Sequence, residues 1–156
     1  MSYTAFFCVY FCTMEKIEVE ILKIDNDYEC RVAFIESAIS AGFPSPCQDY
    51  MDASIDFNKE LIRNPSATFC ARVTGNSMID EGIEDGDILV VDRSLRPVDG
   101  KIVVSFIDGE FTLKRLRVDM SGVWLQPANP AYPPIRIEEG NNFQVWGVVT
   151  YVIKKK

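Results

Sequence analysis

The sequence GNSMIDEGIEDGDILVVD, from Gly75 to Asp92, carries the features around which the rest of the chain is arranged. A polar turn at residues 75–78 contains Ser77, and a second turn at residues 84–87 precedes the apolar run ILVV at residues 88–91. Such a run is typical of a buried strand. A serine in a Gly/Asn turn beside a strand is placed as an exposed nucleophile with backbone N–H groups nearby. The alternative is ordinary turn chemistry, in which the hydroxyl bonds its own backbone.

Composition limits the chemistry that Ser77 can perform. The 156 residues include no histidine, which excludes a Ser-His-Asp triad, a Cys-His dyad and a His-ligated metal. A nucleophilic Ser77 therefore needs a lysine, a carboxylate or the terminal amine as its base.

The best candidate base is Lys114, in the segment GEFTLKRLRV at residues 109–118. The segment is predicted to be a strand, with Lys114 on the same face as Thr112, Leu116 and Val118. Burial on a partly apolar face would favour the neutral amine, which can accept a proton. The neighbouring Arg115 cannot serve, because a guanidinium does not deprotonate in proteins. A solvated strand lysine remains the alternative.

The second half of the chain has the pattern of an all-β domain. Short segments of strand character recur without long helices between them, which predicts a barrel-like domain of antiparallel strands. Asp108-Gly109 is a tight hairpin signal, and Asp99-Gly100 marks another turn. Strands are expected at Thr68–Val73, Asp87–Asp92, Lys101–Ile107, Glu110–Val118, Val123–Pro127 and Phe143–Ile153, and a short helix at Asp56–Ile62.

Three motifs in this order resemble the LexA/UmuD family of self-cleaving Ser–Lys peptidases: SAGFPSPCQDY, GNSMIDEGIEDGDILVVD and GKIVVSFIDGEFTLKRL. The resemblance runs from Gly42 to about residue 154. It implies a catalytic dyad of Ser77 and Lys114, no metal or other cofactor, and self-cleavage between Ala41 and Gly42. It also implies that residues 1–41 form an N-terminal arm and residues 42–156 a peptidase and dimerisation domain.

The segment before Gly42 matches the family poorly. Residues 15–23 alternate in a strand-like pattern, and Arg31–Ala41 has helical spacing. Residues 1–13 are apolar but too short to span a bilayer. They are interpreted either as an over-extended reading frame ahead of Met14 or as a hydrophobic strand that docks on the domain or on a partner.

Charge and cysteine content bear on location and partners. The net charge of −7 argues against direct nucleic-acid binding, which requires a basic face. Five cysteines without a CxxC pair or a secretory signal suggest reduced thiols in the cytoplasm. The resemblance implies a homodimer that cleaves itself on a RecA filament on single-stranded DNA. The processed form would then serve a UmuC-like translesion polymerase in damage-induced mutagenesis.

Two other functions remain open from the sequence. A signal-peptidase-like Ser–Lys protease would need a membrane anchor, and residues 1–13 are inadequate for one. A non-catalytic polymerase-binding module would retain Ser77 and Lys114 as relics.

Overall fold

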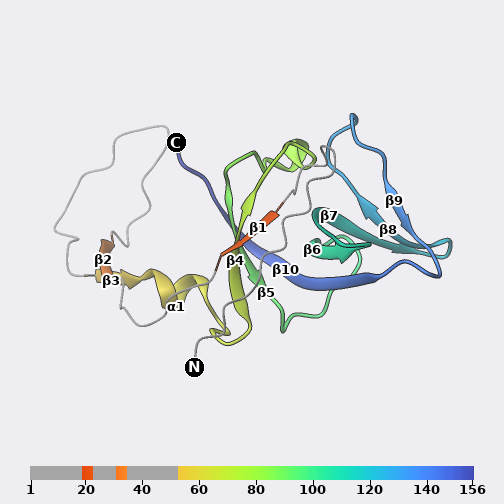
Figure 1. The fold of residues 1–156 in the computed structure, drawn as a ribbon. Helices are drawn as coiled ribbons and strands as arrows, with labels where there is room; N and C mark the ends of the chain where they lie inside the picture. The colour runs from red at the N-terminus through yellow and green to blue at the C-terminus, as the bar shows by residue number, and fades with distance from the viewer. Residues whose placement is uncertain (1–18, 23–30, 35–52) are drawn as a thin grey trace, which may run out of the picture.

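The structure is a computed structural model and describes residues 19–22, 31–34 and 53–156. Its main feature is an eight-stranded antiparallel sheet in the order β1-β4-β5-β10-β6-β7-β8-β9, and a separate β2–β3 pair lies beside α1 (Figure 1). The sheet strands are β1 (Val19–Leu22), β4 (Thr68–Val73), β5 (Ile88–Asp92), β6 (Ile102–Ile107), β7 (Glu110–Asp119), β8 (Gly122–Gln126), β9 (Ile135–Ile137) and β10 (Phe143–Ile153). The remaining elements are β2 (Arg31–Phe34), β3 (Ala53–Asp56), α1 (Phe57–Leu61) and the 3₁₀-helix η1 (Ile79–Glu81). The mostly-β, barrel-like class expected from the sequence is confirmed.

All six strands predicted from Thr68 onward are present, with bounds that differ by one residue at most. The Asp108-Gly109 hairpin is confirmed as well: both residues have positive φ, 48° and 103°, as the tight turn between β6 and β7 requires. Strand β9 was not expected, because its three residues follow two prolines and are too few to show a pattern. No helix among the described residues is long and apolar enough to cross a membrane.

The helix predicted at Arg31–Ala41 is wrong for its first four residues. Arg31–Phe34 instead forms β2, which pairs antiparallel with β3 from Arg31↔Asp56 to Phe34↔Ala53. A short segment with weak helical spacing gains more from a backbone ladder with a neighbouring strand than from an isolated helical turn. Residues 35–41 lie outside the described residues. The helix expected at Asp56–Ile62 is confirmed in α1, where the Asp56 side chain caps the first turn by accepting from the Asn58 N–H at 3.1 Å.

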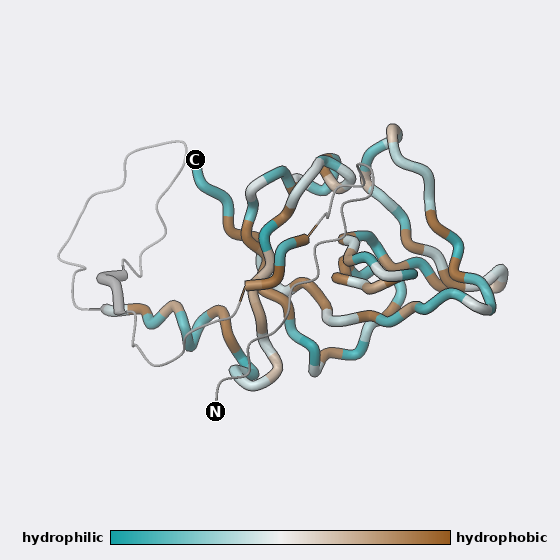
Figure 2. Tube along the Cα trace, in the orientation of Figure 1, coloured by the Kyte–Doolittle hydropathy of each residue, from teal (hydrophilic) through white to brown (hydrophobic). Residues whose placement is uncertain are grey.

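Two apolar clusters cover the sheet. One contains Met78, Ile83, Leu89, Val91 and Leu113, and the other contains Val103, Leu116, Leu125 and Val148. Figure 2 shows the hydrophobic positions gathered in the strands at the centre of the molecule and the hydrophilic ones in the connecting loops.

Strand β10 joins the two halves of the sheet, since it pairs with β6 through its first half and with β5 through its second (Figure 1). The register shifts between Val145 and Gly147, where the strand passes from one partner toward the other. A Cβ at Gly147 would lie 2.7 Å from Val91 Cγ1, so this close approach requires glycine.

Candidate active site

Ser77 lies in the loop between β4 and η1, and backbone hydrogen bonds fix this loop on both sides. Gly75 has φ 94° and donates its N–H to Asp85 Oδ1 at 2.7 Å, which closes the start of the turn. The Ser77 carbonyl accepts from the Ala128 N–H at 2.9 Å, and the Ala128 carbonyl accepts from the Asp80 N–H at 2.9 Å. The serine is therefore held between its own turn and the loop that follows β8.

The expectation that Ser77 is exposed is wrong, since only 6% of the residue is accessible. The following residue explains this: Met78 is 1% exposed and packs in the core cluster with Ile83 and Leu89. A methionine buried at this position draws the turn against the sheet. Among the described residues, none accepts a hydrogen bond from the backbone N–H of Ser77 or Met78.

Lys114 lies in the middle of β7, opposite Val103 of β6, and is 3% exposed. Its Nζ lies 3.0 Å from Ser77 Oγ, although the two residues are 37 positions apart in the chain. Two further contacts orient the amine: Thr112 Oγ1 at 2.8 Å and the Leu113 carbonyl oxygen at 3.1 Å. The structure thus brings together the two side chains predicted as a dyad and buries the lysine, where the charged form of an amine is disfavoured.

The hydrogen-bond geometry suits a neutral amine. A neutral amine has two hydrogens and one lone pair. The Leu113 carbonyl can only accept, and Thr112 Oγ1 can accept, so the two hydrogens have acceptors. A neutral amine bound in this way can also accept from the Ser77 hydroxyl, whose Oγ lies 3.0 Å from Nζ. Such an arrangement can remove a proton from a serine without a histidine.

Several supporting residues were not identified from the sequence. Thr112 was placed only on the face of Lys114, and its contact with Nζ was not predicted. Asn129 donates its Nδ2–H to the Asn76 carbonyl at 2.8 Å, which ties the loop after β8 to the serine turn. Arg115, excluded as a base, donates to Glu81 of η1 and to the Gly100 carbonyl. The Asn-Pro pair at residues 129–130 is a turn signal that could have indicated this loop, although the sequence analysis did not use it.

The predicted cleavage residues Ala41 and Gly42 lie outside the described residues, as do residues 1–13. Their relation to Ser77 stays a prediction.

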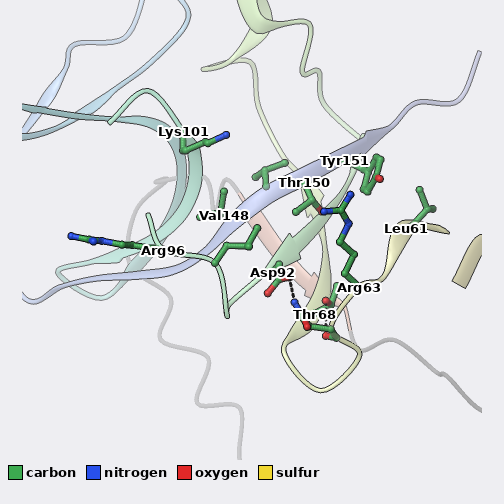
Figure 3. A pocket seen from close by; sticks show the side chains of 12 residues that line it. Leu61, Arg63, Thr68, Asp92, Arg96, Lys101, Val148, Thr150 and Tyr151 are labelled. Atoms are coloured by element: carbon green, nitrogen blue, oxygen red, sulfur yellow. Dashed lines mark hydrogen bonds between the residues drawn. The ribbon is translucent and has the colours of Figure 1, made fainter. Parts of the chain in front are cut away.

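A pocket of about 450 Å³ lies away from the dyad, among α1, β4, β5 and β10 (Figure 3). Its lining includes Arg63, Asp92, Lys101 and Tyr151 but neither Ser77 nor Lys114. The Asp92 carboxylate at its edge accepts from Asn64 Nδ2 at 2.9 Å.

Comparison with known proteins places these observations in a family. The Peptidase S24-like family matches residues 33–150. Protein SamA of Salmonella typhimurium is 47% identical over 115 residues, which cover 74% of this chain and 79% of that protein. Protein MucA of Escherichia coli is 46% identical over 121 residues, 77% of this chain and 82% of that protein. The LexA repressor of Acidithiobacillus ferrooxidans is 37% identical over 119 residues, 74% of this chain and 58% of the repressor.

Proposed function

This chain belongs to the Peptidase S24-like family, in its UmuD-like group, and we propose that it is a self-cleaving serine peptidase with Ser77 as nucleophile and Lys114 as base. The observation that carries the proposal is the 3.0 Å contact between Lys114 Nζ and Ser77 Oγ inside a buried site. A serine–lysine contact of this length is within the range in which proton transfer takes place.

The reaction proceeds in two stages. Neutral Lys114 takes the proton from Ser77, whose Oγ attacks the carbonyl carbon of Ala41. The amine of Gly42 leaves with the proton returned by Lys114, and Ala41 remains bound to Ser77 as an ester. Water, deprotonated by Lys114, then hydrolyses the ester and restores the free serine.

The oxyanion that forms on the Ala41 carbonyl needs donors. The N–H groups of Ser77 and Met78 are suited to this role, because no described residue accepts from either of them. One such donor contributes about 3 kcal/mol to stabilisation of the transition state.

The bond between Ala41 and Gly42 divides the chain into an arm of residues 1–41 and a domain of residues 42–156. Mass spectrometry of purified protein incubated at alkaline pH tests this directly, since the two products must sum to the intact chain with one added water. Gly42→Val should slow the reaction by crowding the approach to Ser77. A cut elsewhere that is insensitive to Gly42→Val would contradict the assignment, and an intact chain would favour a non-catalytic binding module.

The wider role that we propose follows from the family. The chain acts in the cytoplasm as a homodimer, cleaves itself in response to a RecA filament on single-stranded DNA, and then serves as accessory subunit of a UmuC-like translesion polymerase. A tethered substrate is present at high effective concentration, so the enzyme needs no pocket for foreign peptides. The net charge of −7 agrees with DNA being held by RecA and not by this chain.

A time course with each component omitted in turn tests this role. Cleavage should accelerate many-fold only when RecA, single-stranded DNA and a nucleotide are all present. Acceleration by DNA alone, or digestion of casein, would contradict a regulated self-cleavage.

A further inference from the structure

Arg115 is a charged side chain of β7 that the reaction described above does not use. Its guanidinium donates to the carboxylate of Glu81 in η1 and to the carbonyl oxygen of Gly100, in the turn before β6. Glu81 lies four residues after Ser77, and Arg115 directly follows Lys114. This ion pair therefore joins the segment that carries the proposed nucleophile to the strand that carries the proposed base.

Two other contacts hold the same segment against β7. Met78, which follows Ser77, belongs to the same apolar core cluster as Leu113. Ser77 Oγ lies 3.0 Å from Lys114 Nζ. Consecutive residues of a strand project from opposite faces, so Leu113 and Arg115 share one face and Lys114 projects from the other. The serine segment thus meets three successive residues of β7, of which Arg115 is the last.

The ion pair differs from the apolar contact in its exposure to solvent. The side chains of Arg115 and Glu81 are 36% and 32% exposed, whereas Met78 and Leu113 are each 1% exposed. A partly exposed pair contributes little to the free energy of unfolding. A planar guanidinium that is held by a second acceptor nevertheless restricts where its carboxylate partner can lie. The pair can therefore fix the position of η1 while the fold depends little on it.

We propose that Arg115 and Glu81 are positioning residues that hold the two side chains of the proposed dyad at reactive distance, so this inference rests on that dyad. The Glu81 N–H donates to the Met78 carbonyl at 3.1 Å, which links the ion pair to the residue after Ser77. Proton transfer requires a heavy-atom distance of about 2.6–3.2 Å, and a misplacement of about 1 Å can slow a reaction about a hundredfold. Without the ion pair, η1 can shift away from β7, and the dyad spends less time within that distance.

The test is the pH profile of self-cleavage for the full chain, followed by intact mass well below the melting temperature of each variant. Glu81→Gln and Arg115→Gln should each lower the alkaline plateau about tenfold and leave the midpoint in place. A purely electrostatic effect on Lys114 would instead move the midpoint down on loss of the acidic charge and up on loss of the cation. Such opposite shifts with an unchanged plateau would overturn the proposal. The matched control is the pair of Arg117 and Asp119, which are also in β7 and 3.0 Å apart: Arg117→Gln should cleave at the wild-type rate.

A double-mutant cycle shows whether the two residues act as a pair. Because either single variant already breaks the ion pair, the double variant of Glu81→Gln and Arg115→Gln should be no slower than the slower single variant. The melting temperatures should stay close to that of the wild type. Losses that multiply to about a hundredfold would overturn the proposal, and so would a wild-type plateau for Glu81→Gln while Ser77→Ala is inactive. A wild-type chain that stays intact at every pH would instead overturn the proposed peptidase function.

Discussion

Lys114 and Asp92 are two buried ionisable side chains of the same sheet, but they differ in the hydrogen-bond partners that surround them. Lys114 is 3% exposed and Asp92 is 4% exposed. Three of the hydrogen-bond partners of Lys114 are uncharged oxygen atoms, from Ser77, Thr112 and Leu113. The Asp92 carboxylate instead accepts from the N–H and hydroxyl of Ser94, at 2.7 and 2.6 Å, and from Asn64.

The difference separates a structural charge at Asp92 from the base that we propose at Lys114. Burial raises the pKa of Asp92, but the hydrogen bonds donated by Ser94 and Asn64 outweigh it and hold the pKa below its usual range. The carboxylate therefore stays charged and ties the residues after β5 to the loop before β4. These three partners of Lys114 are uncharged oxygen atoms, so none of them requires the amine to carry a charge. Two equally buried ionisable groups are thus held by partners of different kinds, and those of Asp92 favour its charged form.

The largest expected effect is on the dyad itself. Ser77→Ala and Lys114→Ala should each reduce self-cleavage by at least about a thousandfold, since nucleophile and base act as one unit. Lys114→Arg should be as damaging, because arginine keeps the charge and cannot act as a base. Intact mass after alkaline incubation measures this, with Lys101→Ala as a control for loss of a lysine outside the dyad. Robust cleavage by the arginine variant would remove Lys114 from its role.

The second effect is the pH dependence of the reaction. If neutral Lys114 is the base, the first-order rate should rise about tenfold per pH unit and level off above the pKa of the base. The rate is measured from the fraction of intact chain at fixed temperature, in buffers of constant ionic strength. A rate that does not change between neutral and alkaline pH would contradict a lysine base.

Asp92→Asn should affect stability and not chemistry. The variant should lose about 1–3 kcal/mol in free energy of unfolding, because an amide cannot accept all the donors that the carboxylate accepts. Urea denaturation measures the loss, and cleavage of the folded variant should proceed at the wild-type rate. Glu139→Gln, at an exposed position, serves as the control for removal of one acidic charge.

The stability difference between wild type and Asp92→Asn should itself depend on pH. The lowered folded-state pKa of Asp92 means that its contribution is present above the unfolded value, about 3.9. That contribution is lost as the pH falls through the lower folded value. A difference that remains constant down to pH 2 would show that charge is not its cause.

The smallest effect is expected for charges at the surface. Arg72 and Glu20 join β4 to β1 at 3.7 Å, with side chains 46% and 64% exposed. Glu20→Gln should change the free energy of unfolding by less than about 0.5 kcal/mol, because solvent screens exposed pairs. The same urea experiment measures it. A loss of stability as large as that of Asp92→Asn would mean that buried and exposed charges contribute equally to the free energy of unfolding.

Several features of this protein could be predicted from the sequence because they depend on neighbouring residues. The strands from Thr68 onward follow from apolar runs bounded by turn residues, and the Asp108-Gly109 hairpin follows from two residues that tolerate positive φ. The lack of histidine restricted the base for Ser77 to a few residue types, with Lys114 the best candidate. These are local or compositional properties, and the surrounding fold does not alter them.

Tertiary structure alone decided the geometry of the site. The 3.0 Å contact of Ser77 with Lys114 requires the register of β6 with β7, the loop after β8 and the burial of Met78. The tertiary structure also brings Thr112 Oγ1 into contact with the Lys114 amine and leaves Ser105 Oγ without a hydrogen-bond partner among the described residues. Segments far apart in the chain come together through strand pairing and core packing. Neither the pairing nor the packing can be predicted from one of the two segments alone. For the same reason Arg31–Phe34, for which the spacing of apolar residues predicted a helix, forms a strand that pairs with β3.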